Sequence, residues 1–504
     1  MNARVSSIAA GIDGTLIDVE CVLTNGLPNL VIVGFANKAV DEAKERVRSA
    51  FASSKISFPK KRITINLAPA DMPKETPALD LAIAAAILLA SEQGSPRDAK
   101  NTIFLGELGL DGSIRPIRGM IGSLLDAKKK GITRFIIPRA NVEQAKLIPD
   151  IELIPLNTIQ DLYGLFTKTK EVASLHTKPF EPPEAGGTQQ TDFGEIVGQQ
   201  RAKRALEIAA AGNHNVLLSG PPGTGKSMLA KAFPAILPRL TQEEILEITH
   251  LHSLTNREYA GIVHERPFRS PHHSASEISI IGGGQRPRPG EISLSHKGVL
   301  FFDELPEFSR ATIEALRQPL EDRVITVSRA KGSHTFPADF TLIATANPCP
   351  CGFYGSTREC TCLPGQIVRY QRKLSGPIID RIDLFVDVDH VRHEKLLSSE
   401  ANEETSENIA NRVDGARRRQ QKRYDDPIVT NAGLDNKQLK RHARLTAAAE
   451  SLLTKAAQRL DISPRSYMRI LKVARTIADI DDVSDIDERH VSEALQYRRQ
   501  PIQL

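Results

Sequence analysis

The chain has 504 residues, of which 40% are hydrophobic and 25% charged, and its 66 basic residues nearly balance its 61 acidic ones to leave a net charge of +5. That length leaves room for about three domains with separate cores. Because the charges are nearly balanced, the chain is not basic throughout. Any surface that binds nucleic acid therefore has to be a local basic patch.

The hydropathy pattern does not predict a membrane protein. The longest apolar stretch, residues 81–90, is too short to span a bilayer. Acidic residues interrupt the N-terminal region, where a secretory signal would need an apolar core. We therefore expect a cytoplasmic protein with no membrane partner, whose five cysteines stay out of disulfides in a reducing compartment.

Three blocks and a linker follow one another along the chain. Residues 1–166 alternate β-prone runs such as "RITINLAP" with helical patterns such as "ALDLAIAAAILLAS", which predicts a domain of mixed strands and helices. Residues 167–191 lose periodicity and become rich in Pro, Gly, Glu and Gln, as linkers do. A second α/β block is expected over 192–392, and a mainly helical, charged block over 393–504.

A phosphate-binding motif opens the second block. The run "GPPGTGKS" follows a short apolar stretch, residues 216–218, and precedes a helical pattern. Glycines let backbone N–H groups surround phosphates, and the helix N-terminus adds a favourable dipole. In such a motif the lysine reaches the β- and γ-phosphates and the hydroxyl residue binds Mg²⁺. The predicted nucleotide-binding residues are Gly220, Pro221, Pro222, Gly223, Thr224, Gly225, Lys226 and Ser227.

Polar side chains end the next two apolar runs. In "GVLFFDELPEF", Asp303 is placed to hold Mg²⁺ and Glu304 to act as the base that orients the attacking water. In "FTLIATANP", Asn347 is placed to contact the γ-phosphate or that water. The plainer alternatives are an acidic strand-to-helix turn and a capping asparagine.

Two arginines further along are candidates for neutralising charge on the transferred phosphate. Arg381 lies in "SGPIIDRIDLFVDV" and can act from a neighbouring subunit, although an ion pair with Asp380 or Asp383 is the alternative. Arg465 lies in the first turn of the helix expected from "SPRSYMRILKVARTIAD", where it can face a nucleotide or remain solvated.

In this order the motifs resemble the AAA+ ATPases of the helix-2-insert group, which includes magnesium chelatase ATPase subunits and MCM helicases. Together with the first block, "RPFRSPHH", "VLFFDELPEF" and "NPCPCG" resemble the YifB/ComM branch in particular. The resemblance implies an AAA+ P-loop core with a helix-2 insert over 192–392, a C-terminal helical lid over 393–504, and ATP and Mg²⁺ as cofactors. It further implies a homo-hexamer with ATP at the subunit interfaces, Arg381 acting in trans and Arg465 as the second sensor.

The same resemblance implies a function in DNA recombination. Proteins of this branch are linked to natural transformation, so we expect a hexameric helicase or branch-migration translocase that acts on single-stranded or branched DNA, with recombination proteins as further partners. A chelatase- or chaperone-like remodeller of a protein partner is the alternative. A hairpin expected in "VITVSRAKGSHTFPADF" would bring Arg329 and Lys331 to DNA inside the ring, unless they are simply solvated.

The first block resembles the Lon protease domain of the ribosomal-S5-like superfamily, an α+β fold. The stretch "KETPALDLAIAAAILLA" aligns with the one that carries Lon's serine, and "GMIGSLLDAKKKG" with the one that carries its lysine. Here the two positions hold Ala78 and Ile121. Because a serine–lysine dyad needs a hydroxyl and an amine, we expect a Lon-like, ChlI-type domain without proteolytic activity.

Four of the five cysteines form the pattern C-x-C-x₈-C-x-C, at Cys349, Cys351, Cys360 and Cys362. Four thiolates in a reducing compartment match a tetrahedral structural Zn²⁺ site, although C-x-C arms are less common than C-x-x-C. Free cysteines or a redox switch are the alternatives.

A basic run, "RVDGARRRQQKRY", stands in the third block. Such clusters can bind a phosphate backbone. On a helix they are more often a solvated face balanced by nearby acids, which "SSEANEETSEN" supplies here, and this is the interpretation we favour.

Overall fold

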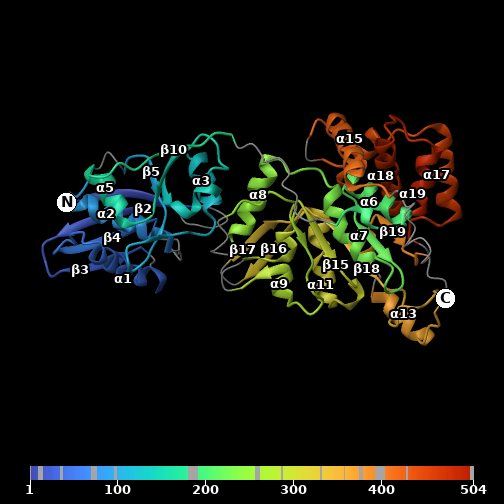
Figure 1. Ribbon diagram of the computed structural model, residues 1–504, viewed down its shortest axis with the longest axis horizontal. Helices are drawn as coiled ribbons and strands as arrows, with labels where there is room; N and C mark the ends of the chain where they lie inside the picture. The colour runs from blue at the N-terminus through green and yellow to red at the C-terminus, as the bar shows by residue number, and fades with distance from the viewer. Residues whose placement is uncertain are drawn as a thin grey trace. The chain divides into compact units, whose positions relative to one another are not determined.

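The computed structural model describes residues 2–8, 15–34, 38–69, 77–95, 99–179, 191–255, 261–284, 288–329, 332–356, 358–373, 378–391, 403–426 and 429–499 (Figure 1). The chain divides into two compact units. The first combines residues 1–184 with 241–264, and the second combines 185–240 with 265–504. Segment 241–264, which the sequence placed in the second block, therefore belongs to the first unit.

A mixed sheet forms the centre of the first unit, with the strand order β10-β9-β8-β5-β1-β2-β4-β3. Its middle strands pair antiparallel, β1 with β2 and β2 with β4, while β5, β8 and β9 run parallel. A two-stranded hairpin of β6 and β7 lies outside the sheet. The strands are β1 (Asn2–Ile8), β2 (Leu16–Thr24), β3 (Asn29–Val33), β4 (Arg62–Ala68), β5 (Thr102–Phe104), β6 (Glu107–Leu108), β7 (Ile114–Arg115), β8 (Arg134–Pro138), β9 (Glu152–Leu156) and β10 (Leu175–His176).

The helices of the first unit are α1 (Lys38–Ser53), α2 (Asp80–Ala90), α3 (Met120–Lys129), α4 (Val142–Ala145), α5 (Ile159–Thr167) and α8 (Gln242–Ser253). Every residue of α2 is buried, because after Asp80 it contains only Leu, Ile and Ala. Arg46 on α1 binds the Asp80 carboxylate with Nε and Nη2, at 2.7 and 3.1 Å. Burial raises the pKa of Asp80 to about 6 although Arg46 opposes it.

Ala78 and Ile121 are both buried in this unit. Ala78 lies in the short 3₁₀ turn ahead of α2, and Ile121 in the first turn of α3. Neither side chain offers a nucleophile or a base. The absence of a proteolytic dyad and the relation to Lon remain predictions.

A parallel sheet forms the centre of the second unit, with the order β12-β15-β18-β11-β19. The strands are β11 (Val216–Ser219), β12 (Phe268–Arg269), β15 (Val299–Phe302), β18 (Thr341–Ala346) and β19 (Leu384–Asp387). Strands β15 and β18 are buried throughout, which explains the continuous apolar run of β15 and the largely apolar sequence of β18. The α/β prediction for this block is confirmed. Because all five strands run the same way, their carboxyl ends meet at one edge, where ligands bind in such sheets.

Further helices and hairpins surround that sheet. The helices are α6 (Gln200–Gly212), α7 (Lys226–Ala232), α9 (Glu277–Ile281), α10 (Glu291–Leu294), α11 (Arg310–Ala315), α12 (Arg317–Asp322) and α13 (Pro364–Lys373). The small strands β13 (Gly282–Gly283) and β14 (Arg288–Pro289) pair antiparallel. Strands β16 (Val324–Arg329) and β17 (Gly332–Pro337) pair from Val324↔Pro337 to Arg329↔Gly332, where the sequence predicted a hairpin.

A helical subdomain completes the second unit, made of α15 (Ser406–Tyr424), α16 (Asn436–His442), α17 (Ala447–Arg459), α18 (Pro464–Ile480) and α19 (Glu488–Gln496). The centre of α18 is buried, and within it Arg475 pairs with Asp479, both completely inaccessible to solvent. A buried ion pair of this kind is strongly destabilising to break from one side, because a lone charge is left behind.

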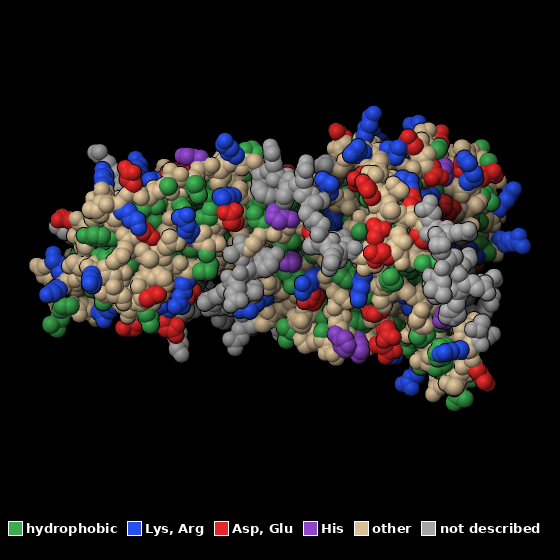
Figure 2. Space-filling model, viewed as in Figure 1, with side chains coloured by type: hydrophobic (Ala, Val, Ile, Leu, Met, Phe, Trp, Pro, Cys, Tyr) green, Lys and Arg blue, Asp and Glu red, His purple; other side chains and the backbone are tan. Residues whose placement is uncertain are grey.

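The basic run of the third block lies on α15, and most of its arginines bind groups of the same unit. Arg412 pairs with Glu207 and Glu404, and Arg423 with Asp479. Arg417 donates to the carbonyl oxygen of Ala210. On the face shown in Figure 2, basic and acidic side chains are likewise interspersed. These contacts favour the interpretation of α15 as a paired structural face.

In the part of the chain that the structure describes, no helix is both long enough and apolar enough to cross a membrane.

Candidate active site

The loop between β11 and α7 holds the predicted phosphate-binding motif. Gly223 and Gly225 have φ of +78° and +88°, which a side chain would strain. The Lys226 ammonium donates to the carbonyl oxygens of Gly220 and Pro221, at 2.6 and 2.7 Å. Burial lowers the pKa of Lys226, while Asp303 and Glu304 raise it. The lysine is thus held over its own loop, next to the acids that end β15.

Oxygen donors meet beside the first turn of α7. The Ser227 hydroxyl lies 3.0 and 3.2 Å from the two carboxylate oxygens of Asp303. The Thr345 hydroxyl, near the end of β18, donates to Asp303 Oδ1 at 2.6 Å. A hydroxyl and a carboxylate are hard oxygen ligands of the type Mg²⁺ prefers, so Ser227 and Asp303 fit the predicted cation.

Asn347 connects the lysine to the predicted base. Its Oδ1 accepts from Lys226 Nζ at 3.3 Å, and its Nδ2 donates to Glu304 Oε1 at 3.1 Å. Glu304 has a left-handed backbone, with φ of +56°. Its N–H donates to Thr345 Oγ1 at 2.8 Å, which helps to hold that conformation. The structure therefore brings the loop lysine, both acids and the asparagine together at the carboxyl edge of the sheet.

Sequence reasoning missed Thr345. Its hydroxyl binds both acids, receiving the Glu304 N–H and donating to Asp303. The available signal was a hydroxyl residue within a buried strand, two positions before Asn347. Sequence alone shows neither which face such a side chain occupies nor which strand lies beside it.

The segment "DFGEIVGQ", residues 192–199, runs to the phosphate-binding loop. Gln199 donates from Nε2 to the carbonyl oxygens of Thr224 and Asp389, at 3.2 and 2.6 Å. The N–H of Gly198 donates to Glu403 Oε1 at 2.6 Å. Gln199 therefore ties the segment 192–199 to the phosphate-binding loop.

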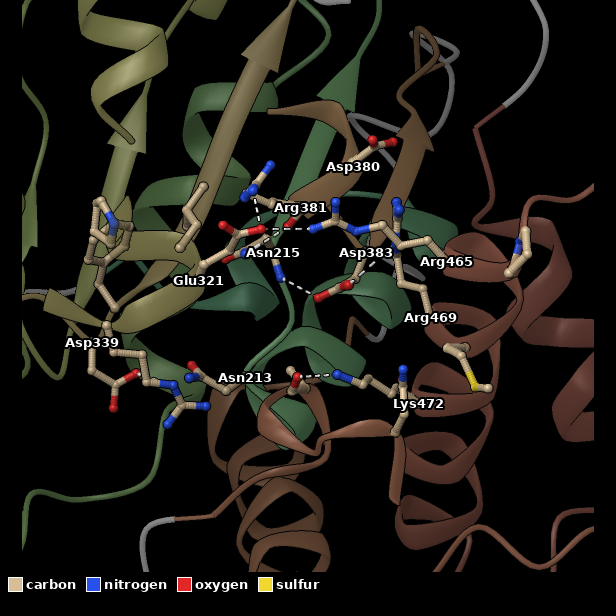
Figure 3. Close-up of a pocket in the computed structure, with 18 residues that line it drawn as sticks. Asn213, Asn215, Glu321, Asp339, Asp380, Arg381, Asp383, Arg465, Arg469 and Lys472 are labelled. Atoms are coloured by element: carbon tan, nitrogen blue, oxygen red, sulfur yellow. Dashed lines mark hydrogen bonds and ion pairs between the residues drawn. The ribbon is translucent and has the colours of Figure 1, made fainter. Parts of the chain in front are cut away.

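Arg381 and Arg465 lie elsewhere. They line a cavity of about 490 Å³ together with Asn213, Asn215 and Asp383 (Figure 3). Asn215 directly precedes β11 and Asp383 directly precedes β19, so this cavity lies at the amino edge of the sheet. A strand rises about 3.3 Å per residue, and β11 alone therefore separates the two edges by roughly 13 Å.

Asn215 organises this amino edge. Its Nδ2 donates to the carbonyl oxygen of Arg381 at 2.9 Å, and its Oδ1 accepts the N–H of Leu342 at 2.9 Å. Its own N–H donates to Asp383 Oδ2 at 3.3 Å. One side chain thus fixes the backbone of Arg381 against the starts of β11 and β18.

Glu321, on α12, binds both arginines. Its Oε1 accepts from Arg381 Nη2 and from Arg465 Nη2, the latter at 3.2 Å (Figure 3). The ion-pair partner of Arg381 is thus Glu321 on α12. The sequence suggested instead one of the flanking aspartates, Asp380 or Asp383. Burial lowers the pKa of Arg381, and so do the charges of Arg465 and Arg317, while Glu321 raises it.

The four predicted metal-ligating cysteines converge in the loop after β18. Their sulfur atoms all lie within 4.8 Å of one another. Three of the distances, Cys349–Cys351, Cys351–Cys360 and Cys349–Cys360, are 3.3, 3.5 and 3.7 Å. A tetrahedral ion with bonds of about 2.3 Å to sulfur places its ligands about 3.8 Å apart. The cluster therefore has the size of a tetrahedral metal site.

The cysteine loop packs directly on the phosphate-binding loop. Gly352 has φ of +87°, and a Cβ atom there would lie 2.6 Å from both Cγ and Cδ of Pro222. Only glycine can satisfy both the backbone conformation and this contact. The same loop begins at Asn347, so it contacts the nucleotide site at two points.

Two predicted DNA contacts cannot be placed. Lys331 lies outside the described residues, and for Arg329 the structure describes the backbone at the end of β16 but not the side chain.

Comparison with known proteins gives family matches along most of the chain. The model for "Magnesium chelatase, subunit ChlI" matches residues 192–396, that for its C-terminal part matches 403–498, and "Subunit ChlI of Mg-chelatase" matches 19–141. Competence protein ComM of Haemophilus influenzae is 42% identical over 98% of this chain and 96% of its own length. The uncharacterized protein YifB of Escherichia coli is 42% identical over 97% and 95%. A magnesium-chelatase 67 kDa subunit of Chlorobaculum parvum is 31% identical over 31% and 23%.

Replacing Thr345 with valine tests this network. Thr345→Val keeps the shape but removes the hydroxyl that binds Asp303 and frees the N–H of Glu304. We expect nucleotide affinity close to wild type and turnover lower by about 10- to 100-fold, as for other groups that orient metal ligands. Steady-state ATP hydrolysis and equilibrium binding of a fluorescent nucleotide measure the two quantities.

Thr345→Ser is the matched control, since it keeps the hydroxyl and should keep most of the turnover. Equal rates in the valine and serine variants would show that the hydroxyl does not organise the two acids.

Proposed function

The chain belongs to the ComM/YifB family of magnesium-chelatase-like AAA+ proteins, and on that premise we propose that it is a Mg²⁺-dependent ATPase that works as a hexameric DNA motor. In this proposal it is a helicase or branch-migration translocase that extends heteroduplex when imported DNA recombines in the cytoplasm. The printed name of the Haemophilus relative, a competence protein, supports the link to transformation.

One observation carries the proposal: the residues predicted for catalysis lie at opposite edges of one parallel sheet. Lys226, Glu304 and Asn347 gather at the carboxyl edge. Arg381 and Arg465 gather at the amino edge, held by Glu321. Since one copy cannot apply both edges to one nucleotide, the arginines serve the ATP of an adjacent copy. A closed ring in which every copy gives one edge and receives the other satisfies all sites.

Each side chain then has a separate task at the shared site. Lys226 leaves its loop carbonyl groups to donate to the β- and γ-phosphates. Ser227 and Asp303 would hold the Mg²⁺ ion, which would supply positive charge to neutralise the phosphates. Glu304 accepts the proton of the attacking water, while Asn347 fixes the carboxylate. Arg381 and Arg465 of the adjacent copy neutralise charge that develops on the transferred group.

The proposal of DNA as substrate rests on the family and on the β16–β17 hairpin. This hairpin stands between the acids of β15 and Asn347 at the end of β18 along the chain. A loop so connected can move with the state of the nucleotide, and the predicted contacts Arg329 and Lys331 belong to it. Phosphate contacts of this kind are independent of base sequence, as a motor requires.

Zinc is the ion we propose for the cysteine cluster. Four sulfur ligands of tetrahedral size suit Zn²⁺ better than hard cations such as Mg²⁺. Backbone N–H groups of Cys351 and Tyr354 point to the sulfur atoms of Cys362 and Cys349, at 3.4 and 3.3 Å. Such hydrogen bonds orient metal-bound sulfur. The ion would give a short loop a fixed shape where it packs on Pro222.

Mixing two inactive variants tests the shared site. Lys226→Ala removes the phosphate lysine and Arg381→Ala removes the arginine that acts in trans. Each alone should hydrolyse little ATP, whereas an equal mixture should recover about a quarter of wild-type activity, since a quarter of random neighbour pairs combine an intact lysine with an intact arginine. ATPase assays of the assembled mixtures, with light scattering to verify assembly, give the result.

ATPase activity can recover in the mixture only if the carboxyl edge and the amino edge of one ATP site come from different copies. A mixture that assembles but stays as inactive as its parts argues against the shared site, and so does full hydrolysis by an Arg381→Ala monomer.

DNA stimulation tests the substrate. We expect single-stranded or branched DNA to raise the ATPase rate of the wild-type chain several-fold. Glu304→Gln should bind ATP normally and lose at least about 100-fold in rate, because the amide cannot accept the proton. Glu307→Gln, in the same turn and exposed, is the control.

An ATPase that ignores every DNA tested would instead favour a remodeller of a protein partner, the activity class suggested by the partial match to a magnesium-chelatase subunit. Wild-type turnover in Glu304→Gln would remove Glu304 from its assigned role.

Metal analysis tests the cysteine cluster. The wild-type chain should carry about one zinc per chain, and Cys360→Ser should lower that content strongly because three thiolates bind the ion less tightly. Cys21→Ala, which removes the remaining buried cysteine, should keep it. Full zinc content while all four thiols react freely with an alkylating agent would contradict the assignment.

A further inference from the structure

Glu321 occupies a position where two arginines share one oxygen atom. Its Oε1 accepts from Arg381, whose side chain is only 4% exposed, and from Arg465. The two guanidinium groups come from η7 (Ile379–Arg381) and from the first turn of α18, far apart in sequence. Guanidinium groups converge in this way on phosphate oxygens. The carboxylate of Glu321 therefore marks an anion-binding position.

Two other acids of the cavity, Asp383 and Asp339, bind other partners. Asp383 pairs with His214 at 3.2 Å. Asp383 also lies near Arg469, as Figure 3 shows. Although burial opposes it, the hydrogen bond from His214 lowers the pKa of Asp383. Asp339 likewise has another partner, because its carboxylate lies 2.8 Å from the ammonium group of Lys297. Glu321 thus counters a local excess of positive charge.

Three arginines create that excess. Arg381 is repelled by both Arg465 and Arg317, and Glu321 attracts it. A phosphate group carries more negative charge and more acceptor oxygens than a carboxylate, so it binds converging guanidinium groups more strongly. A phosphate that enters the cavity will therefore displace Glu321.

The helix that carries Glu321 continues into the β16–β17 hairpin. Helix α12 ends at Asp322, and Arg323 reverses the chain with φ of +56° directly before β16. Gln318 on α12 exchanges two hydrogen bonds with Thr326 on β16, at 3.2 and 3.3 Å. These two hydrogen bonds connect α12 to the first strand of the hairpin.

We propose that Glu321 is a positioning residue that holds Arg381 and Arg465 until the terminal phosphate of the adjacent copy's ATP displaces it, and that its release moves the β16–β17 hairpin. This inference rests on the proposed function, since it needs a nucleotide shared between copies. It adds the link by which the nucleotide of one copy sets the position of the DNA-facing hairpin in the next.

Glu321→Gln tests the link in the assembled full-length chain. Without a competing carboxylate the arginines bind the phosphate unopposed, so the KM for ATP should fall several-fold. Because the position of the hairpin no longer depends on phosphate binding, the ratio of ATPase rates with and without DNA should fall towards unity. Hydrogen exchange of β16 and β17 should change on ATP addition in the wild-type chain and stay constant in the variant.

Two variants serve as controls. Glu314→Gln alters an exposed acid on α11 whose partner is the exposed Arg310, and it should behave as wild type. Glu321→Asp keeps the charge one methylene shorter, and it should restore part of the DNA response. A merely structural role would raise the KM and lower kcat in Glu321→Gln without changing the ratio.

A wild-type DNA ratio together with a wild-type exchange response of the hairpin in Glu321→Gln overturns the inference. Failure of the shared site itself is seen separately, because the mixture of Lys226→Ala and Arg381→Ala is assayed with Glu321 intact.

Discussion

The common direction of five parallel strands is the constraint on which the second unit depends. It gathers whatever follows each strand at one edge and whatever precedes each strand at the other. Lys226, Asp303 and Asn347 follow strands, while Asn215, Arg381 and Asp383 precede them. The polar chemistry is therefore divided between two surfaces, and the apolar strands between them keep the two halves apart.

Hydrogen bonds between neighbouring strand ends hold each half in shape. At the carboxyl edge Thr345 joins the ends of β15 and β18, and at the amino edge Asn215 joins the starts of β11 and β18 to the backbone of Arg381. The hydroxyl of the buried Thr345 and the side-chain amide of the half-buried Asn215 both have hydrogen-bond partners. Such edges suit the shared site that we propose.

Contiguous motifs could be predicted from the sequence, and contacts between distant segments could not. The phosphate loop, the acids of β15 and Asn347 each follow an apolar run, so strand order alone places them together. Thr345 and Glu321 gave no such signal, because their roles depend on strand pairing and on a helix packed across the amino edge. The four cysteines can be recognised by their number and spacing. The close contact of Gly352 with Pro222 cannot, because it depends on how two loops pack together in space.

The assignment of α8 to the first unit bears on how the chain is made. Its Ile245, Ile248 and Leu251 are buried, and α8 packs against α3. A ribosome must therefore synthesise the β11 strand and the phosphate loop before the first unit receives its last helix. Cutting the chain within 167–191 removes α8 from the first unit, and a cut before residue 175 also removes β10 from its sheet, so the predicted linker is not the boundary of that unit.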